Sequence, residues 1–425
     1  MGALSQFRGL PKQVYYLSVI RVIMALGSLV FPFLSLMMTS YLGFNEFQSG
    51  CVMIFVSAGN IIGSFGGGKL GDMYGRKKVF VSASVVAIFM AFLAGFLAPS
   101  VYMLPCILLS YFASSLVMPV VAAMITDHSD ETNRAECFSI LFLTQNIGYA
   151  IGPSVGGMLY YSHMKWIFYG EAMMYSIAII IAIFMIRDVY VIPTREERLA
   201  VKLAHREKKS VEGDENTFVL LLKMPILLGF ILCLALLTAC YQEIGFVLPM
   251  QFEDMCGAEL GSKYAGYIWT ANGLTIVFAT PLIISLSKRR NQLKNVMVAA
   301  LLYAVGFGLN GYINWPFGIL LVAIIWSAGE ILISTGAGVF IAGYSPETHR
   351  ARFQSLYEVA RGLGRGIGPT VCGWYLLSHN YRQLWTLVAL VCVAMTGVVY
   401  WLYRAQQKES LENNNTVSKT KEADL

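Results

Sequence analysis

Residues 131–163 read ETNRAECFSILFLTQNIGYAIGPSVGGMLYYSH, and residues 347–379 read ETHRARFQSLYEVARGLGRGIGPTVCGWYLLSH. The two stretches align without a gap at a spacing of 216 residues (347 − 131 = 216), and 13 of their 33 positions are identical. The Gly-x-x-x-Gly-Pro core and the closing Ser-His recur in register. Because this spacing is about half of the 425 residues, the sequence predicts a chain built from two copies of one unit.

The composition is that of a membrane protein. Apolar residues make up 56% of the chain and charged residues only 13%, and the mean hydropathy is +0.61. An apolar helix needs about 20 residues to cross about 30 Å of hydrocarbon. By this measure we expect twelve transmembrane helices, at residues 14–40, 47–68, 78–98, 101–125, 136–161, 166–187, 218–250, 264–286, 294–313, 317–343, 352–377 and 383–403.

One long polar segment divides these helices six and six. We therefore expect an all-α integral membrane fold with two pseudo-symmetric six-helix bundles, at residues 1–187 and 218–404. Residues 188–217 form a cytoplasmic linker, either solvated or folded as an amphipathic helix on anionic lipid, and residues 405–425 a disordered cytoplasmic tail. In membrane proteins such repeats are typical of transporters that rock one half against the other around a central site.

The net charge of +6 reflects membrane orientation and does not indicate nucleic-acid binding. By the positive-inside rule both termini are cytoplasmic, and no removable signal peptide is expected. The cytoplasmic loops carry most of the basic residues, namely Lys69, Arg76, Lys77, Lys78, those of residues 195–209, Lys288, Arg289, Arg290, Lys294, Arg350 and Arg352. The opposite side carries Lys165, Lys263 and Arg382.

The loop after the second expected helix contains Gly68, Asp72, Gly75 and Arg76 in the sequence GKLGDMYGRKK. It resembles the Gly-x-Leu-x-Asp-x-x-Gly-Arg-Lys motif of the major facilitator superfamily. The resemblance covers essentially the whole chain, and it implies that Asp72 helps to hold the two halves together on the cytoplasmic side. It also implies a monomer in the cell membrane, with lipids, protons and a small molecule as its partners.

The repeated Gly-Pro segment places small residues on one helix face. Gly148, Gly152 and Gly156 are four residues apart, followed by Gly157, and such spacing permits close helix approach. Pro153 can bend the helix. This segment resembles the antiporter motif of the drug:proton exporters and favours export, although a plain packing seam explains the glycines equally. The second copy repeats the pattern at Gly364, Gly368 and Pro369.

Acidic residues inside apolar helices are candidates for proton coupling, because a charge in hydrocarbon costs several kcal/mol unless it is paired or solvated. Glu330 lies near the middle of the tenth helix, and Asp127 ends the fourth. Both resemble positions that take part in coupling in bacterial multidrug exporters of the superfamily. The structural alternative is a pair with an arginine for Glu330 and solvation at the cytoplasmic helix end for Asp127. Glu358 is the third candidate. Glu171 and Glu243 are either external gate residues or simply near the interface.

The substrate-cavity candidates are polar, cationic or aromatic. Glu358, Arg361 and Arg365 share one helical face, where the arginines either pair internally or bind an anionic group of the substrate. The fourth helix lacks the intramembrane arginine usual in drug exporters, and Arg21 could supply that charge from the first helix. The full set is Arg21, Gln145, Gln242, Asn272, Trp326, Arg361 and Arg365.

These features predict a transporter that works by alternating access and exports small amphipathic compounds or drugs in exchange for protons. The alternative is transport of an organic anion or anionic metabolite bound by Arg361 and Arg365, and a more distant one is a membrane sensor without transport. No phosphate-binding Gly-x-x-x-x-Gly-Lys-Ser/Thr loop for ATP occurs. No nucleophile motif or metal-ligand spacing is present, so we expect neither an enzyme, a metal site nor a cofactor other than the coupling proton.

Overall fold

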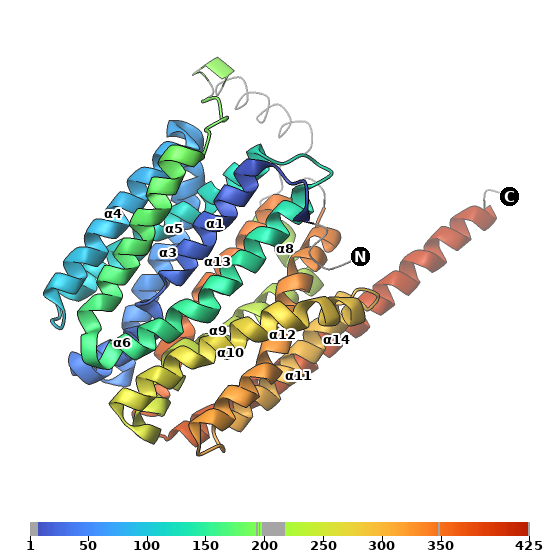
Figure 1. Ribbon diagram of the computed structural model, residues 1–425. Coiled ribbons are helices and arrows are strands. Elements are labelled where there is room, and N and C mark those ends of the chain that lie inside the picture. Colours follow the sequence, from blue (N-terminus) through green and yellow to red (C-terminus); the bar gives the residue numbers. More distant parts are fainter. Residues whose placement is uncertain (1–6, 193, 195, 198–216, 347–348, 424–425) are drawn as a thin grey trace.

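The computed structural model describes residues 7–192, 194, 196–197, 217–346 and 349–423, and its regular elements over this range are all helical (Figure 1). The basic part of the linker, where an amphipathic helix was one prediction, lies almost wholly outside the described residues. The first half contains α1 (Lys12–Leu26), η2 (Phe31–Phe33), α2 (Leu34–Leu36), η3 (Met37–Tyr41), α3 (Glu46–Tyr74), α4 (Arg76–Leu97), α5 (Met103–Asp127) and α6 (Arg134–Met185). The second contains α8 (Thr217–Leu222), α9 (Pro225–Cys256), α10 (Ala258–Ser287), α11 (Gln292–Asn310), α12 (Pro316–Tyr344), α13 (Arg350–Leu376) and α14 (Tyr381–Ala423).

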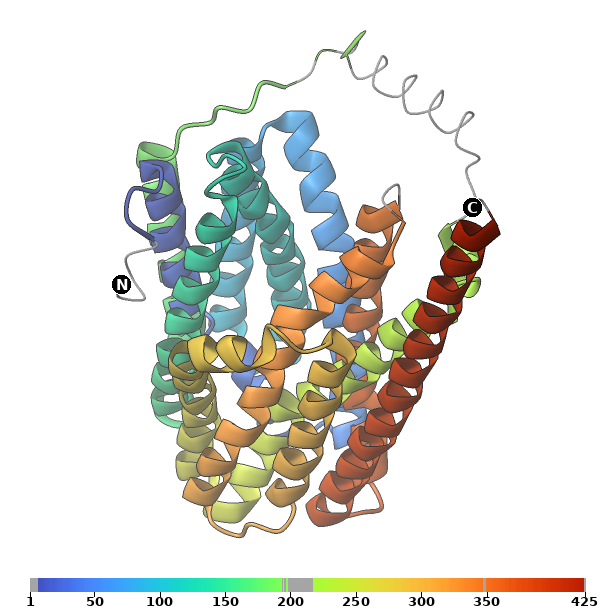
Figure 2. The ribbon, with the colours of Figure 1, turned by 90° about the vertical axis from the view of Figure 1, so that its right-hand side faces the viewer.

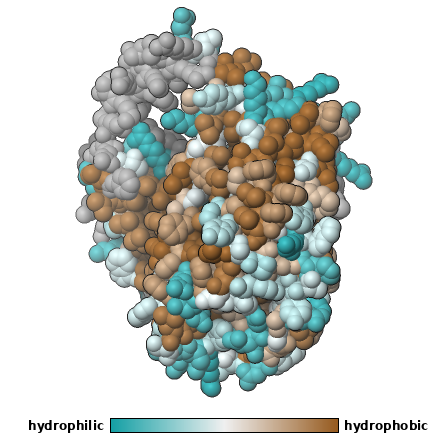
Figure 3. Space-filling view, turned by 90° about the vertical axis from the view of Figure 1, so that its left-hand side faces the viewer, coloured by the Kyte–Doolittle hydropathy of each residue, from teal (hydrophilic) through white to brown (hydrophobic). Residues whose placement is uncertain are grey.

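The all-helical membrane fold is confirmed. Ten stretches of the described chain are long and apolar enough to span a membrane. One of them is α6, which joins the fifth and sixth expected spans across a kink at His163 (φ −143°, ψ 48°). The eleventh expected span, α13, is absent from the ten because of its charges and glycines. Figure 3 shows hydrophobic side chains over much of one face. Exposed apolar side chains of α4 include Phe89, Phe92 and Phe96.

The first helix is not continuous over residues 14–40 as expected. Regular α1 ends at Leu26, and the chain turns through Gly27 and Ser28 before short helical pieces carry it on to Tyr41. The break leaves backbone N–H groups without helical partners, and the carboxylate of Glu171 accepts one of them from Val30 at 3.2 Å. The hydropathy pattern did not reveal this break because Gly27 and Ser28 are only two residues within a long apolar stretch.

The two copies of the Gly-Pro segment pack in equivalent ways. Gly148 and Gly152 lie directly against the backbone of α1, so closely that a side chain would clash. Gly364 and Gly368 lie equally close to the backbone of α9, at Ala235 and Ala239. The small residues therefore form the packing seam that their spacing predicts, once in each half.

The halves meet at two pairs of contacts that are related by the 216-residue repeat. Gly50 of α3 lies against Pro369 of α13, and Gly266 of α10 lies against Pro153 of α6 (266 − 50 = 369 − 153 = 216). Likewise the backbone of Glu46 contacts Gly373, and that of Ser262 contacts Gly157 (262 − 46 = 373 − 157 = 216). We call these four contacts the closed seam.

The closed seam lies at the end of the bundle away from the linker, here called the far end. Figure 2 shows the two halves meeting there and diverging toward the linker. Thr370 adds a hydrogen bond across the seam, donating its hydroxyl to the Gly50 carbonyl at 2.9 Å. The structure is therefore closed at the far end.

The C-terminal segment differs from the expected disordered tail. Helix α14 continues without interruption through Ala423 and projects beyond the bundle in Figure 1. The segment is polar, which suggested disorder, but it contains Gln, Lys, Glu and Ala residues of high helix propensity and lacks proline. Its helix can thus extend the preceding apolar span.

Candidate functional site

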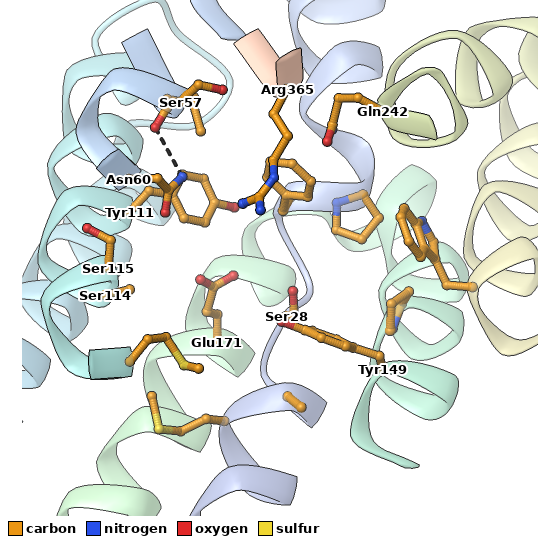
Figure 4. A pocket seen from close by; sticks show the side chains of 18 of the residues that line it. Ser28, Ser57, Asn60, Tyr111, Ser114, Ser115, Tyr149, Glu171, Gln242 and Arg365 are labelled. Carbon is orange, nitrogen blue, oxygen red and sulfur yellow. Dashed lines mark hydrogen bonds between the residues drawn. The ribbon is translucent and has the colours of Figure 1, made fainter. Parts of the chain in front are cut away.

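A cavity of about 360 Å³ lies between the halves, on the linker side of the closed seam. Its wall comes from α1, α3, α5 and α6 of the first half and from α9, α10 and α13 of the second. Figure 4 shows Asn60, Tyr111, Glu171, Gln242 and Arg365 around one space. Residues from both halves therefore meet at a single site, as alternating access requires.

Two arginines line this cavity. Arg21 of α1 is only 5% exposed, and no carboxylate among the described residues forms an ion pair with it. Arg365 of α13 enters from the other half and is 40% exposed at its side chain. Its carboxylate neighbour Glu358 is 3.9 Å away and itself 58% exposed. The cavity wall thus holds two cations that are weakly neutralised by the protein.

Several hydrogen-bond donors in the same wall lack acceptors. The Nε of Arg21, the hydroxyl of Tyr111 and the indole Nε1 of Trp269 are buried and have no partner in the described part of the chain. Unsatisfied buried donors are costly, and a ligand that accepts hydrogen bonds would satisfy them. Glu171, the carboxylate among the described residues of the wall, is 6% exposed and accepts a hydrogen bond from the N–H of Val30.

Glu330 lies in a polar cluster within the second half. The side-chain amide of Asn272 donates to its carboxylate at 2.7 Å and to the hydroxyl of Ser327 at 2.9 Å. The hydroxyl of Tyr241 also hydrogen-bonds to Glu330. The cluster joins α9, α10 and α12, so a change of charge at Glu330 would act on three helices of one bundle.

The arginines of α13 have different surroundings. Arg361 pairs with Glu358 at 3.0 Å and lies over the ring of Tyr357 at 5.4 Å. It is absent from the cavity wall, whereas Arg365, one turn further on, lines it. The structure therefore combines internal pairing at Arg361 with a cavity position at Arg365.

The loop motif is organised around an ion pair. Arg76 pairs with Asp127 and also donates to the Ala123 carbonyl, which joins the start of α4 to the end of α5. Asp72 is 63% exposed at its side chain and lies 3.8 Å from Arg76. Gly75 adopts φ +97°, a conformation that favours glycine, at the turn between α3 and α4. Asp127 is therefore held by an ion pair and is not simply solvated at the helix end, and its coupling role stays a prediction.

Residues 17–337 and 257–423 both match the Major Facilitator Superfamily. The chain belongs to this superfamily. It is a multi-pass membrane transporter, in agreement with the resemblance of its loop motif.

Individual relatives are distant but extend over nearly the full length. A Na(+), Li(+), K(+)/H(+) antiporter of Planococcus maritimus is 24% identical over 418 residues, covering 91% of this chain and 94% of the relative. The uncharacterized MFS-type transporter YdeE of Escherichia coli is 24% identical over 373 residues, covering 85% and 88%.

Solved structures of the same fold include two that differ in substrate. A peptide transporter POT in complex with sulfate superposes with a TM-score of 0.76 at 16% identity, over 94% of this chain and 96% of that one. The nucleoside transporter NupG (D323A mutant) superposes with a TM-score of 0.75 at 15% identity, over 92% and 100%. These structures show the fold alone.

Of the transporter's remaining predicted cavity residues, some line the cavity and others lie elsewhere. Gln242 lines the cavity together with Arg21 and Arg365. Asn272 belongs to the Glu330 cluster, and Trp326 is fully buried in the core of the second half, with its ring 5.9 Å from that of Tyr241. Gln145 is partly buried on α6 and is not among the lining residues.

Several cavity residues had no distinguishing signal in the sequence. Asn60, Tyr111 and Tyr149 line the cavity, but tyrosine and asparagine occur throughout the apolar helices. For Glu171 the sequence predicts either an external gate residue or a position near the interface, whereas the structure places it in the cavity wall. Its charge within a long apolar stretch was the signal that could have placed it here.

Proposed function

We propose that the chain is a proton-coupled secondary transporter that exports small amphipathic compounds carrying an anionic group. The observation that carries the proposal is the pair of arginines in the cavity wall, of which Arg21 is buried without a described ion pair. A guanidinium binds carboxylate or phosphate oxygens through a fixed fork of donors. The rings of Phe31, Tyr149 and Trp269 supply apolar surface for the rest of such a molecule.

Glu330 is the proposed coupling residue. It is the acidic residue of the apolar α12, and its hydrogen bonds reach two neighbouring helices. Protonation would remove its charge and weaken it as an acceptor of the hydrogen bonds from Asn272 and Tyr241. Such a change can bias the equilibrium between two conformations of the transporter.

In the proposed orientation the linker end and both termini lie in the cytoplasm. We propose that the chain is a monomer in the plasma or inner membrane. The basic loops between α3 and α4 and between α10 and α11 support this orientation. With that orientation the closed seam faces outward, and the structure is the inward-facing state. The Gly-Pro segment, through its resemblance to the antiporter motif, supports export.

Purified protein in vesicles with an imposed pH gradient tests the proposal. Anionic amphipathic compounds should produce a substrate-dependent proton flux, read with an entrapped pH dye, and cationic analogues should not. Arg365→Gln should raise the KM about tenfold, since a hydrogen bond to a charged group contributes about 1.5–3 kcal/mol and 1.4 kcal/mol is a factor of ten. Glu330→Gln should abolish the proton-driven flux.

Arg361→Gln is the matched control, because Arg361 lies one turn away on the same helix and outside the cavity wall. The proposal fails if both arginine variants change the KM equally, or if only cationic compounds move protons. It also fails if Glu330→Gln leaves pH-driven transport intact.

A second candidate function is exchange of alkali cations for protons. The full-length similarity to a Na(+), Li(+), K(+)/H(+) antiporter favours it, and the carboxylate of Glu171 is a ligand that such cations prefer. The nearby arginines oppose it electrostatically. Sodium, lithium and potassium gradients applied to the same vesicles distinguish the two functions.

A further inference from the structure

Glu243 of α9 is a buried carboxyl without a counter-ion. It is 0% exposed, and apart from the thiol of Cys372, a weak donor, neither of its oxygens has a hydrogen-bond partner in the described part of the chain. The residues around it on α9, such as Ile244, Phe246 and Val247, are also fully buried and apolar. An ionised carboxylate in such a place would be strongly destabilised, and the neutral acid would not.

The groups that face Glu243 do not supply a positive charge. The titratable ones are thiols, Cys372 of α13 and Cys240 one turn earlier on α9, with Cys392 of α14 behind Cys240. Among the described residues of the neighbouring helices, no lysine, arginine or histidine acts on the carboxyl. Burial of Glu243 therefore requires a bound proton in this conformation.

The carboxyl lies directly behind the closed seam. A side-chain carbon on Gly368 would be 3.0 Å from a carboxylate oxygen of Glu243, so this oxygen contacts the backbone of α13. On the other side of the same stretch, Gly366 faces Ser57 and Pro369 faces Gly50 of the first half. Only the backbone of a glycine-rich helix turn separates Glu243 from the contact between halves.

We propose that Glu243 is a proton-binding site whose occupancy follows the closed seam: it holds a proton while the far end is closed and releases it when the far end opens. When the halves separate, the seam face of α13 meets water, and no side chain at Gly366 or Gly368 shields the carboxyl. Pro369 lacks a backbone N–H, which lets α13 bend at this point. Proton binding therefore stabilises the closed far end, and a rise in pH favours the open one.

This site rests on the proposed proton-coupled transport for its use in the cycle, where it would take up a proton from the far side as the far end closes and return it as the far end opens. The binding itself involves neither substrate nor Glu330. It can therefore be tested without transport, and its failure is distinguishable from failure of the proposed function.

A cross-link across the far end reports closure. Ser40 donates to the carboxylate of Glu253 at 2.6 Å across the two halves, so a Ser40→Cys, Glu253→Cys protein should be joined by a short bifunctional thiol reagent only when closed. Cys51, Cys256 and Cys372 are partly exposed, so the first two are replaced by serine and Cys372, which lies beside Glu243, by alanine. Cleavage at a protease site introduced into the linker separates the two halves unless they are cross-linked. A gel then resolves the cross-linked protein from the separated halves.

In detergent, or in vesicles without a pH gradient, the cross-linked fraction of the protein should decrease at least about fivefold as the pH rises from about 5.5 to about 7.5. Coupling between two sites usually changes an equilibrium by about 5- to 150-fold. Glu243→Gln keeps the shape of the neutral acid, so its cross-linking should stay near the acidic level at every pH. The Glu243→Gln protein also corrects for the pH dependence of thiol reactivity. Glu259→Gln, at an exposed carboxylate paired with Lys263 near the same end, should behave as the parent.

The proposal is overturned if Glu243→Gln retains the parent's pH dependence, or if the parent shows none. Infrared spectroscopy provides an independent measurement. The parent at neutral pH should show the C=O stretch of a protonated carboxylic acid that Glu243→Gln lacks. A Glu243→Gln spectrum with an unchanged carboxylic acid band would also contradict the assignment.

Discussion

Gly50 is the position at which a single methyl group should change the balance between the two states of the transporter. A side-chain carbon there would lie far inside contact distance of the Pro369 carbonyl and of the Thr370 backbone, which cannot move aside as a flexible side chain could. Overpacking of this kind costs about 1–3 kcal/mol. The gain in helix propensity of alanine over glycine, up to about 1 kcal/mol, is common to the closed and open states and cancels between them.

The closed far end of Gly50→Ala should therefore be disfavoured by about 5- to 150-fold relative to the parent. The Ser40–Glu253 cross-link, with linker cleavage as its readout, measures this change directly. Gly59→Ala is the matched control on the same helix, since its added carbon would meet only Phe112 at an ordinary 3.8 Å. Equal cross-linking in the two alanine variants would refute the packing argument.

The pseudo-symmetric position offers a second test of the same reasoning. Gly266→Ala meets the Pro153 carbonyl in the equivalent contact, so it should lower cross-linking by a similar factor. The double variant should lower it further, because the two contacts are separate parts of one seam. A double variant no worse than either single one would show that the seam does not open as a unit.

Three further predictions concern residues away from the seam. Asn272→Leu removes a donor to Glu330 and should reduce proton-driven flux severalfold with unchanged expression, and a parent-like pH profile of transport would refute it. Arg76→Gln leaves the partner of a largely buried ion pair unpaired and should cost about 1–3 kcal/mol, seen as a lower melting temperature in detergent, while Asp72→Asn, at an exposed side chain, should change it little. Trp326→Ala should cost about 3–5 kcal/mol without altering substrate preference, so a variant of normal stability and changed preference would contradict its core position.

The sequence by itself determined the superfamily, the all-helical membrane fold and the repeat. Helix spans follow from runs of apolar residues, and close packing follows from glycines four residues apart, so both are properties of short stretches. Prediction and structure agree most closely where the spacing of glycines permits only close helix packing. Gly148 and Gly364 are examples, since each lies against the backbone of a neighbouring helix. The helical extension of α14 shows the limit, because a polar composition alone does not distinguish a solvated helix from a disordered tail.

Only the tertiary structure decided which polar side chains share the cavity. Arg361 and Arg365 are alike in the sequence and one turn apart, yet one pairs with Glu358 and the other lines the cavity. Glu171 and Glu243 are likewise alike in the sequence, but the first lies in the cavity wall and the second lies behind the closed seam without a counter-ion. The physical reason is that the rotation of each helix about its axis, and the break in the first one, depend on packing against helices more than a hundred residues away.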